Sequence, residues 1–71
     1  MNSQLMDREA VLRAELKVLV TEHRARDAEI KQIEEERPHD MFTLKRLKRE
    51  KLHLKDRISR IEDQLTPDII A

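Results

Sequence analysis

Two histidines and one aspartate are the residues of this sequence whose types best suit metal binding. His23 and Asp27 are four residues apart, so on a helix their side chains lie on the same face. The helix pairing described below brings His53 to the same level, and imidazole and carboxylate groups are Zn²⁺ ligands. In the simpler interpretation His23 packs between helices and hydrogen-bonds to Asp27, while His53 lies in solvent. We therefore predict no metal or cofactor, and only His23, Asp27 and His53 are candidate ligands.

Catalytic chemistry has little support in the residue types. The 71 residues include no Cys, no Gly and a single aromatic residue, Phe42. This composition excludes cysteine-based zinc sites and a glycine-rich phosphate loop, and it leaves no aromatic platform for base stacking. No serine, histidine and carboxylate are expected to form a nucleophilic triad, because two helices enclose no pocket. We predict a non-enzymatic protein without catalytic residues.

A basic stretch in the second half raises the possibility of nucleic-acid binding. Residues 44–57 read LKRLKREKLHLKDR, with seven Lys or Arg residues against two acidic ones. Most of these cations are expected to flank a contact between helices, which leaves Lys45, Arg46, Arg49 and Lys55 pointing mainly to water. Of these four, Lys45, Arg46 and Arg49 form a basic face clear of acidic residues. Such a face can bind phosphates. Because the chain has no net charge, nucleic acid is the alternative partner and not the preferred one.

Apolar residues at heptad spacing predict the elements that carry these groups. They recur along both halves of the chain, at Leu5, Leu12, Leu16, Leu19, Ile30 and Ile33 and at Leu44, Leu47, Leu54, Ile58, Ile61 and Leu65. Charged residues, mostly good helix formers, make up 42% of the sequence, which is typical of long solvated helices. Two long helices separated by a short break therefore account for most of the chain.

The break lies at ERPHD, residues 36–40. Pro38 disfavours helical geometry at Arg37, and Asp40 can accept hydrogen bonds from the first free amides of the next helix. We predict an all-α fold, an antiparallel two-helix hairpin of coiled-coil type that forms one domain over residues 1–71. Its helices are expected at about 3–36 and 41–66, with the turn at 37–40 and a short tail at 67–71.

Folding the chain about this turn pairs the heptad residues of the first helix with those of the second in a single register. Ile33 then faces Leu44 beside the turn, and Leu12 faces Leu65 at the open end. The same register predicts ion pairs along the two edges of the contact, Arg13 with Glu62, Asp27 with Lys48 and Glu22 with Arg57. Exposed pairs of this kind contribute only ~0–1 kcal/mol each, so they select the alignment more than they stabilise it.

One layer of the contact is polar. Arg26 faces Lys51 there, and two glutamates on the adjacent edge can neutralise both cations. A polar layer inside a coiled coil costs stability and fixes the alignment of the helices. We predict a register-setting quartet composed of Arg26, Glu29, Glu50 and Lys51.

Some apolar residues fall outside this contact. Val11, Val18 and Ala25 form a heptad-spaced column on the first helix, and Leu52 stands outside the contact on the second. A short hairpin buries little apolar surface by itself, and such a column can pack against a third helix. We expect a protein interface at these residues, formed with a second copy as a homodimer, which would make a helical bundle, or with another helical protein.

The sequence shows no feature of a membrane protein. Its longest apolar run is Val18–Val20, far too short to span a bilayer. The first twelve residues, MNSQLMDREAVL, lack the apolar core of a signal peptide. We expect a cytoplasmic protein with no membrane partner.

Two segments and the turn between them resemble a known family. The segments are EHRARDAEIKQIE at 22–34 and LKRLKREKLHLKDRI at 44–58. Together with the Pro and Asp of the turn, they are similar to the YdcH-like family of short bacterial helical-hairpin proteins. The resemblance runs from about Leu19 to Leu65, and the closing LTPDIIA resembles the tail of longer members. It implies a hairpin fold, and since the family's function is unknown it implies no catalytic or binding residues.

Overall fold

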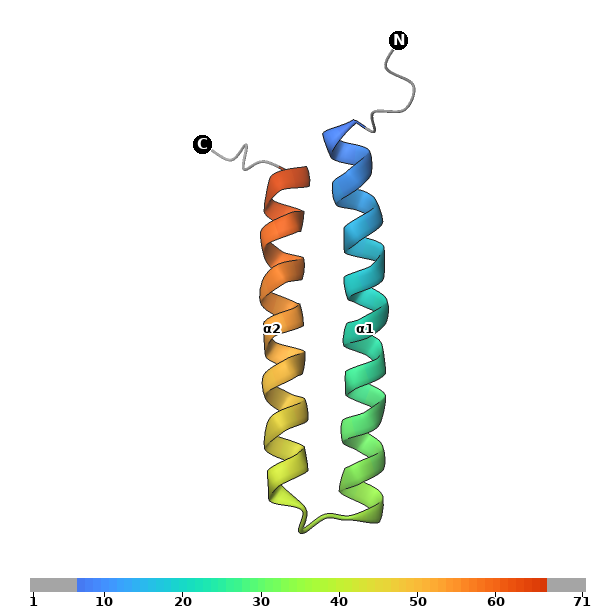
Figure 1. The fold of residues 1–71 in the computed structure, drawn as a ribbon, viewed down its shortest axis with the longest axis vertical. Helices are drawn as coiled ribbons and strands as arrows, with labels where there is room; N and C mark the ends of the chain where they lie inside the picture. Colours follow the sequence, from blue (N-terminus) through green and yellow to red (C-terminus); the bar gives the residue numbers. More distant parts are fainter. Residues whose placement is uncertain (1–6, 67–71) are drawn as a thin grey trace.

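The computed structural model describes residues 7–66, which form two antiparallel helices joined by a short turn (Figure 1). Helix α1 spans Arg8–Glu36 and helix α2 spans Met41–Leu65. The two helices lie side by side along their length, and the described residues contain no β-strand. The predicted all-α hairpin is confirmed. The expected helical residues 3–6 and the tail at 67–71 lie outside the described residues.

Side chains and proline chemistry set the ends of α1. The Asp7 carboxylate accepts a hydrogen bond of 3.1 Å from the backbone N–H of Glu9, which makes Asp7 the N-cap of the helix. At the other end Arg37 leaves helical geometry, with φ −140° and ψ 64°. Its backbone N–H still donates to the carbonyl of Ile33 at 2.7 Å. Pro38 follows directly, and its ring disfavours helical geometry at the preceding residue.

Asp40 caps α2, as the sequence predicts. Its carboxylate accepts a hydrogen bond of 3.1 Å from the backbone N–H of Thr43. This bond, helped by the Arg37 guanidinium 3.5 Å away, holds the pKa of Asp40 below its ordinary value. At the C-terminal end, Thr66 is the cap and donates its N–H to the Glu62 carbonyl at 2.9 Å. The helix therefore ends at Leu65, one residue before the expected boundary.

The core consists of heptad residues alone. Six of the described side chains are buried, and all six occupy predicted contact positions: Leu19, Ile30, Ile33, Leu44, Leu47 and Ile61. Four of them form one cluster beside the turn, here called the turn cluster: Ile30, Ile33, Leu44 and Leu47. Toward the open end, Leu12 and Leu65 are only half-buried. Among residues 7–66 no polar side chain is buried, so apolar contact alone makes up the interior.

Candidate functional site

The predicted polar layer is present, but its two cations turn in different directions. Arg26 forms an ion pair with Glu29 and reaches Glu50 with its Nε at 3.3 Å. Lys51 instead donates to the carboxylate of Asp27 at 2.6 Å. The predicted quartet is therefore wrong in one member, because Lys51 neutralises Asp27 and does not join the two glutamates. The hydrogen bond from Lys51 lowers the pKa of Asp27 below its ordinary value.

The ion pairs between the helices divide between two edges of the contact. Positions on either side of a heptad seam lie on opposite edges of a coiled coil. One edge holds Asp27 with Lys51 at 2.6 Å and Glu34 with Lys48 at 3.7 Å. The other edge holds Arg26 with Glu50 and Glu15 with Arg57, both at 3.3 Å. The hairpin therefore has two chemically distinct edges.

The predicted edge pairs do not form. Arg13 binds Glu9 of its own helix at 2.7 Å, and Arg57 selects Glu15, so neither finds the expected partner. The third expected pair, Asp27 with Lys48, is replaced by the contacts above. A long side chain at an exposed position can pair with any of several acidic residues, because each exposed ion pair contributes only ~0–1 kcal/mol to stability. Heptad spacing fixes the helix register without fixing these partners.

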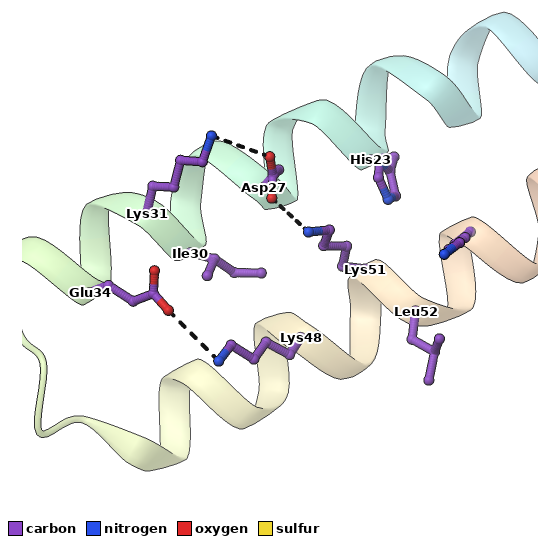
Figure 2. Close-up of a pocket in the computed structure, with 9 residues that line it drawn as sticks. His23, Asp27, Ile30, Lys31, Glu34, Lys48, Lys51 and Leu52 are labelled. Carbon is purple, nitrogen blue, oxygen red and sulfur yellow. Dashed lines mark hydrogen bonds and ion pairs between the residues drawn. The ribbon is translucent and has the colours of Figure 1, made fainter.

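An open groove, which was not predicted from the sequence, follows the edge that holds Asp27 and Lys51. Figure 2 shows Lys31 and Lys51 approaching Asp27 from two sides, with Lys48 beside Glu34. The groove continues along the same edge past Lys55. We call it the lysine groove, and its lining residues are Val20, His23, Arg24, Asp27, Ile30, Lys31, Glu34, Lys48, Lys51, Leu52, Lys55, Ile58, Ser59 and Glu62. Lys48 and Lys55 beside the seam, with Lys51 in its polar layer, were the available sequence signal.

The candidate metal ligands are not brought together. His23 and Asp27 both line the lysine groove, whereas His53 is exposed and does not. His53 follows Leu52 by one residue, which turns its side chain by about 100° around the helix axis. Asp27 is also occupied by two lysines, at 2.6 and 3.7 Å. Within residues 7–66 no three His, Asp or Glu side chains are grouped to hold a metal ion. The three-residue site considered from the sequence is wrong in its placement of His53.

The predicted apolar column is exposed on α1. Val11 and Val18 are 45% and 56% exposed, and Ala25 is exposed as well. We call Val11, Val18 and Ala25 the valine column. Leu52 is 56% exposed, but it lines the lysine groove, projecting from α2 away from α1 in Figure 2. The four residues predicted as one interface therefore belong to two separate surfaces.

The outward cations of α2 are placed as predicted. Lys45, Arg46 and Arg49 are exposed, and none of them forms an ion pair with a described residue. Phe42 stands one helical turn before Arg46 and is 82% exposed. From the sequence this single ring was discounted as a platform for base stacking, and its exposure was not predicted. Its position two residues before Leu44, off the seam, was the signal for its exposure.

Comparison with family models identifies residues 16–62 as a match to the family described as protein of unknown function (DUF465). The match covers most of the chain. The chain belongs to this family. DUF465 is the YdcH-like family that the two sequence segments resemble, so that prediction is confirmed. Comparisons with curated proteins and with solved structures found no match.

The residues matched by the DUF465 family model include some of the candidate surfaces completely and the valine column only in part. It contains every residue of the lysine groove and of the polar layer, whereas Val11 lies before it. The family's description gives none of these residues a role.

Neither α1 nor α2 combines the length and the apolar composition that crossing a bilayer requires.

Proposed function

We propose that this DUF465 hairpin is a small non-enzymatic interaction module that binds a further helix through the valine column. The observation that supports the proposal is the exposure of Val11 and Val18, about half of each side chain, at heptad spacing on a helix already packed by its other side. Regular seven-residue spacing is what a partner helix needs in order to contact every second turn.

The energetics of a short hairpin favour such a partner. Only six side chains are buried within the described residues. Complete burial of each valine of the column would contribute roughly 1.5–3 kcal/mol, a large amount against the marginal stability of a small domain. Small residues flank the column at Ala14, Thr21 and Ala28, and all three are exposed. They allow a second backbone to approach closely.

Substitution of the column tests the proposal. Val11→Lys with Val18→Lys places two charges on the contact, so we expect association to fall to background in sedimentation velocity while far-UV circular dichroism stays helical. Asp56→Asn with Asp63→Asn is the matched control, since it makes the same change of two charges at exposed positions of α2. Unchanged association of the valine variant, relative to the control, would refute a role for the column.

A second candidate function is nucleic-acid association through Lys45, Arg46 and Arg49. It is supported by the exposed ring of Phe42 and by the lack of ion pairs between these cations and any described residue, because cations bind phosphates and an aromatic ring stacks on a base. Salt-dependent binding of a labelled single-stranded oligonucleotide, lost in Lys45→Glu with Arg49→Glu, would favour this candidate over the helix partner.

The cellular location and the partner remain predictions from composition and pattern. We propose a cytoplasmic location, and a second copy of this chain or another helical protein as the partner. The module would then act by contact alone, without a cofactor.

A further inference from the structure

The face of α1 around the valine column combines apolar and acidic groups, and the exposed cations Arg8 and Lys17 lie at its borders. Between residues 11 and 29 the exposed positions around the valine column are Val11, Ala14, Glu15, Val18, Thr21, Glu22, Ala25, Ala28 and Glu29. The three glutamates recur every seven residues, so they form a row beside the column with a spacing of about 10.5 Å. The face therefore has the pattern of an acidic amphipathic helix.

The lysine groove has the complementary pattern. Ile30, Val20 and Ile58 supply apolar surface along its floor, and Leu52 adds an exposed apolar side chain at its rim. Its rims carry five cations against three carboxylates: Arg24, Lys31, Lys48, Lys51 and Lys55 against Asp27, Glu34 and Glu62. The groove is thus positively charged overall in a chain whose net charge is zero.

Both surfaces include charged residues that form no ion pair within residues 7–66. Arg24 and Lys55 are such cations in the groove, and Glu22 is such a carboxylate beside the valine column. Lys48 and Lys55 are seven residues apart on α2, so their spacing of about 10.5 Å equals that of neighbouring glutamates in the row. Glu22 can therefore meet Lys55 when α1 of one hairpin lies along the groove of another. A second contact, from Glu15 or Glu29 to Lys48, would exchange ion pairs that these residues form within each hairpin.

We propose that the valine-column face of one copy docks as a third helix in the lysine groove of a second copy. This inference rests on the proposed function and names the partner, a second copy of this chain. A symmetric contact between two valine columns would instead bring two rows of glutamates together, and like charges across an interface oppose association. Charge complementarity therefore selects the groove as the receptor for the column.

The arrangement of the surfaces makes the association directional. Glu15, beside the valine column, pairs with Arg57 on one edge of the hairpin, whereas the lysine groove follows the opposite edge. Each docking event uses the column of one copy and the groove of the next, and leaves one of each unoccupied. Such head-to-tail contacts extend into open chains unless they close into a ring. Assembly should grow with concentration and weaken in salt, which screens exposed charges.

Mixing two variants tests this geometry. The column variant Val11→Lys with Val18→Lys keeps its groove, and the groove variant Lys48→Glu with Lys55→Glu keeps its column. In sedimentation velocity we expect wild-type chains to grow beyond dimers at low salt, each variant alone to be monomeric, and an equimolar mixture to stop at a one-to-one dimer. Lys45→Glu with Arg49→Glu makes the same charge change as the groove variant outside the groove and should assemble like the wild type.

The contrary outcomes separate this inference from the proposed function. Association of the groove variant at the wild-type level would overturn the groove as receptor and leave the column as an interface. A wild-type protein that is monomeric at every concentration and at low salt would also overturn self-association, leaving the column for another protein. Association of the column variant at the wild-type level would overturn both.

A second measurement needs no substitution. A zero-length carbodiimide cross-link joins a carboxylate to an amine in direct contact, and Glu22 and Lys55 belong to opposite edges of one hairpin. In a mixture of ¹⁵N-labelled and unlabelled chains we expect mixed-isotope cross-links from Glu22 to Lys48 or Lys55. Their absence, with cross-links seen only within single chains, would overturn the proposal even if a variant failed to fold.

Discussion

The polar layer provides the sharpest test of how this hairpin is stabilised. We predict that Arg26→Leu with Lys51→Leu makes the folded hairpin more stable. The two positions face each other directly beyond the turn cluster, so two leucines there would extend it toward the open end. The carboxylates left behind, Asp27, Glu29 and Glu50, are partly exposed and can be hydrated in place.

The expected magnitude follows from exposure. The side chains of Arg26 and Lys51 are 31% and 36% exposed, so roughly two thirds of each leucine would leave water. Full burial of a leucine contributes about 1.5–3 kcal/mol, and the aliphatic stems now present already supply part of this. We expect a gain of ~2 kcal/mol for the pair, reduced to a net ~1 kcal/mol by the lost surface ion pairs. That corresponds to a rise in Tm of about 4–8 °C.

Thermal unfolding followed by circular dichroism at 222 nm measures the change. Lys45→Leu with Arg49→Leu is the matched control, because it exchanges the same number of cations for leucines at exposed positions without ion pairs. The control should leave Tm within a few degrees of the wild type, since surface substitutions typically change stability by less than about 0.5 kcal/mol. A fall in Tm of the Arg26 and Lys51 variant would show that the layer stabilises the hairpin, against the reasoning above.

Two further predictions concern single carboxylates. Asp40→Ala removes the acceptor for the Thr43 amide and should lower Tm by about 4–8 °C, whereas Asp40→Asn keeps a capping acceptor and should lower it far less; equal losses in the two variants would contradict capping as the cause. Because the hydrogen bond from Lys51 lowers the pKa of Asp27 in the folded state, its stabilising contribution is present above the ordinary pKa of about 3.9 and is lost as pH falls through the lower folded value. Asp27→Asn should therefore make Tm decline less steeply below about pH 4, and a decline parallel to the wild type would argue against this linkage.

The fold was accessible from the sequence because its determinants are local and periodic. Heptad spacing predicted the contact positions of all six buried residues, and the chemistry of Pro38 and Asp40 predicted the turn between the helices. Each of these is a property of residue type at a fixed interval. The start of α1 was less accessible, since Asp7 was not recognised as an N-cap and the helix begins at Arg8. A capping aspartate is a single residue with no repeat to support it.

The candidate surfaces were accessible only in part. Val11 and Val18 were identified correctly as exposed, because a heptad position fixes whether a side chain points toward the partner helix. Leu52 was grouped with them wrongly, since a list of residues outside the seam does not say which edge each one occupies. The lysine groove was missed because Lys48 and Lys51 had each been assigned to acidic residues and Lys55 to solvent. An excess of charge along an edge emerges only when both helices are considered together.

The position of the turn cluster also has a kinetic consequence. Its four buried side chains are contributed by residues close in sequence, so the loop that must close to join them is short and has a low entropic cost. We expect the contacts between the helices to form first beside the turn and then in order toward the open end of the hairpin. Leu12 and Leu65, half-buried at the far end, would join last and separate first. A competing helix would therefore enter the seam from that end, at a fraction of the free energy of global unfolding.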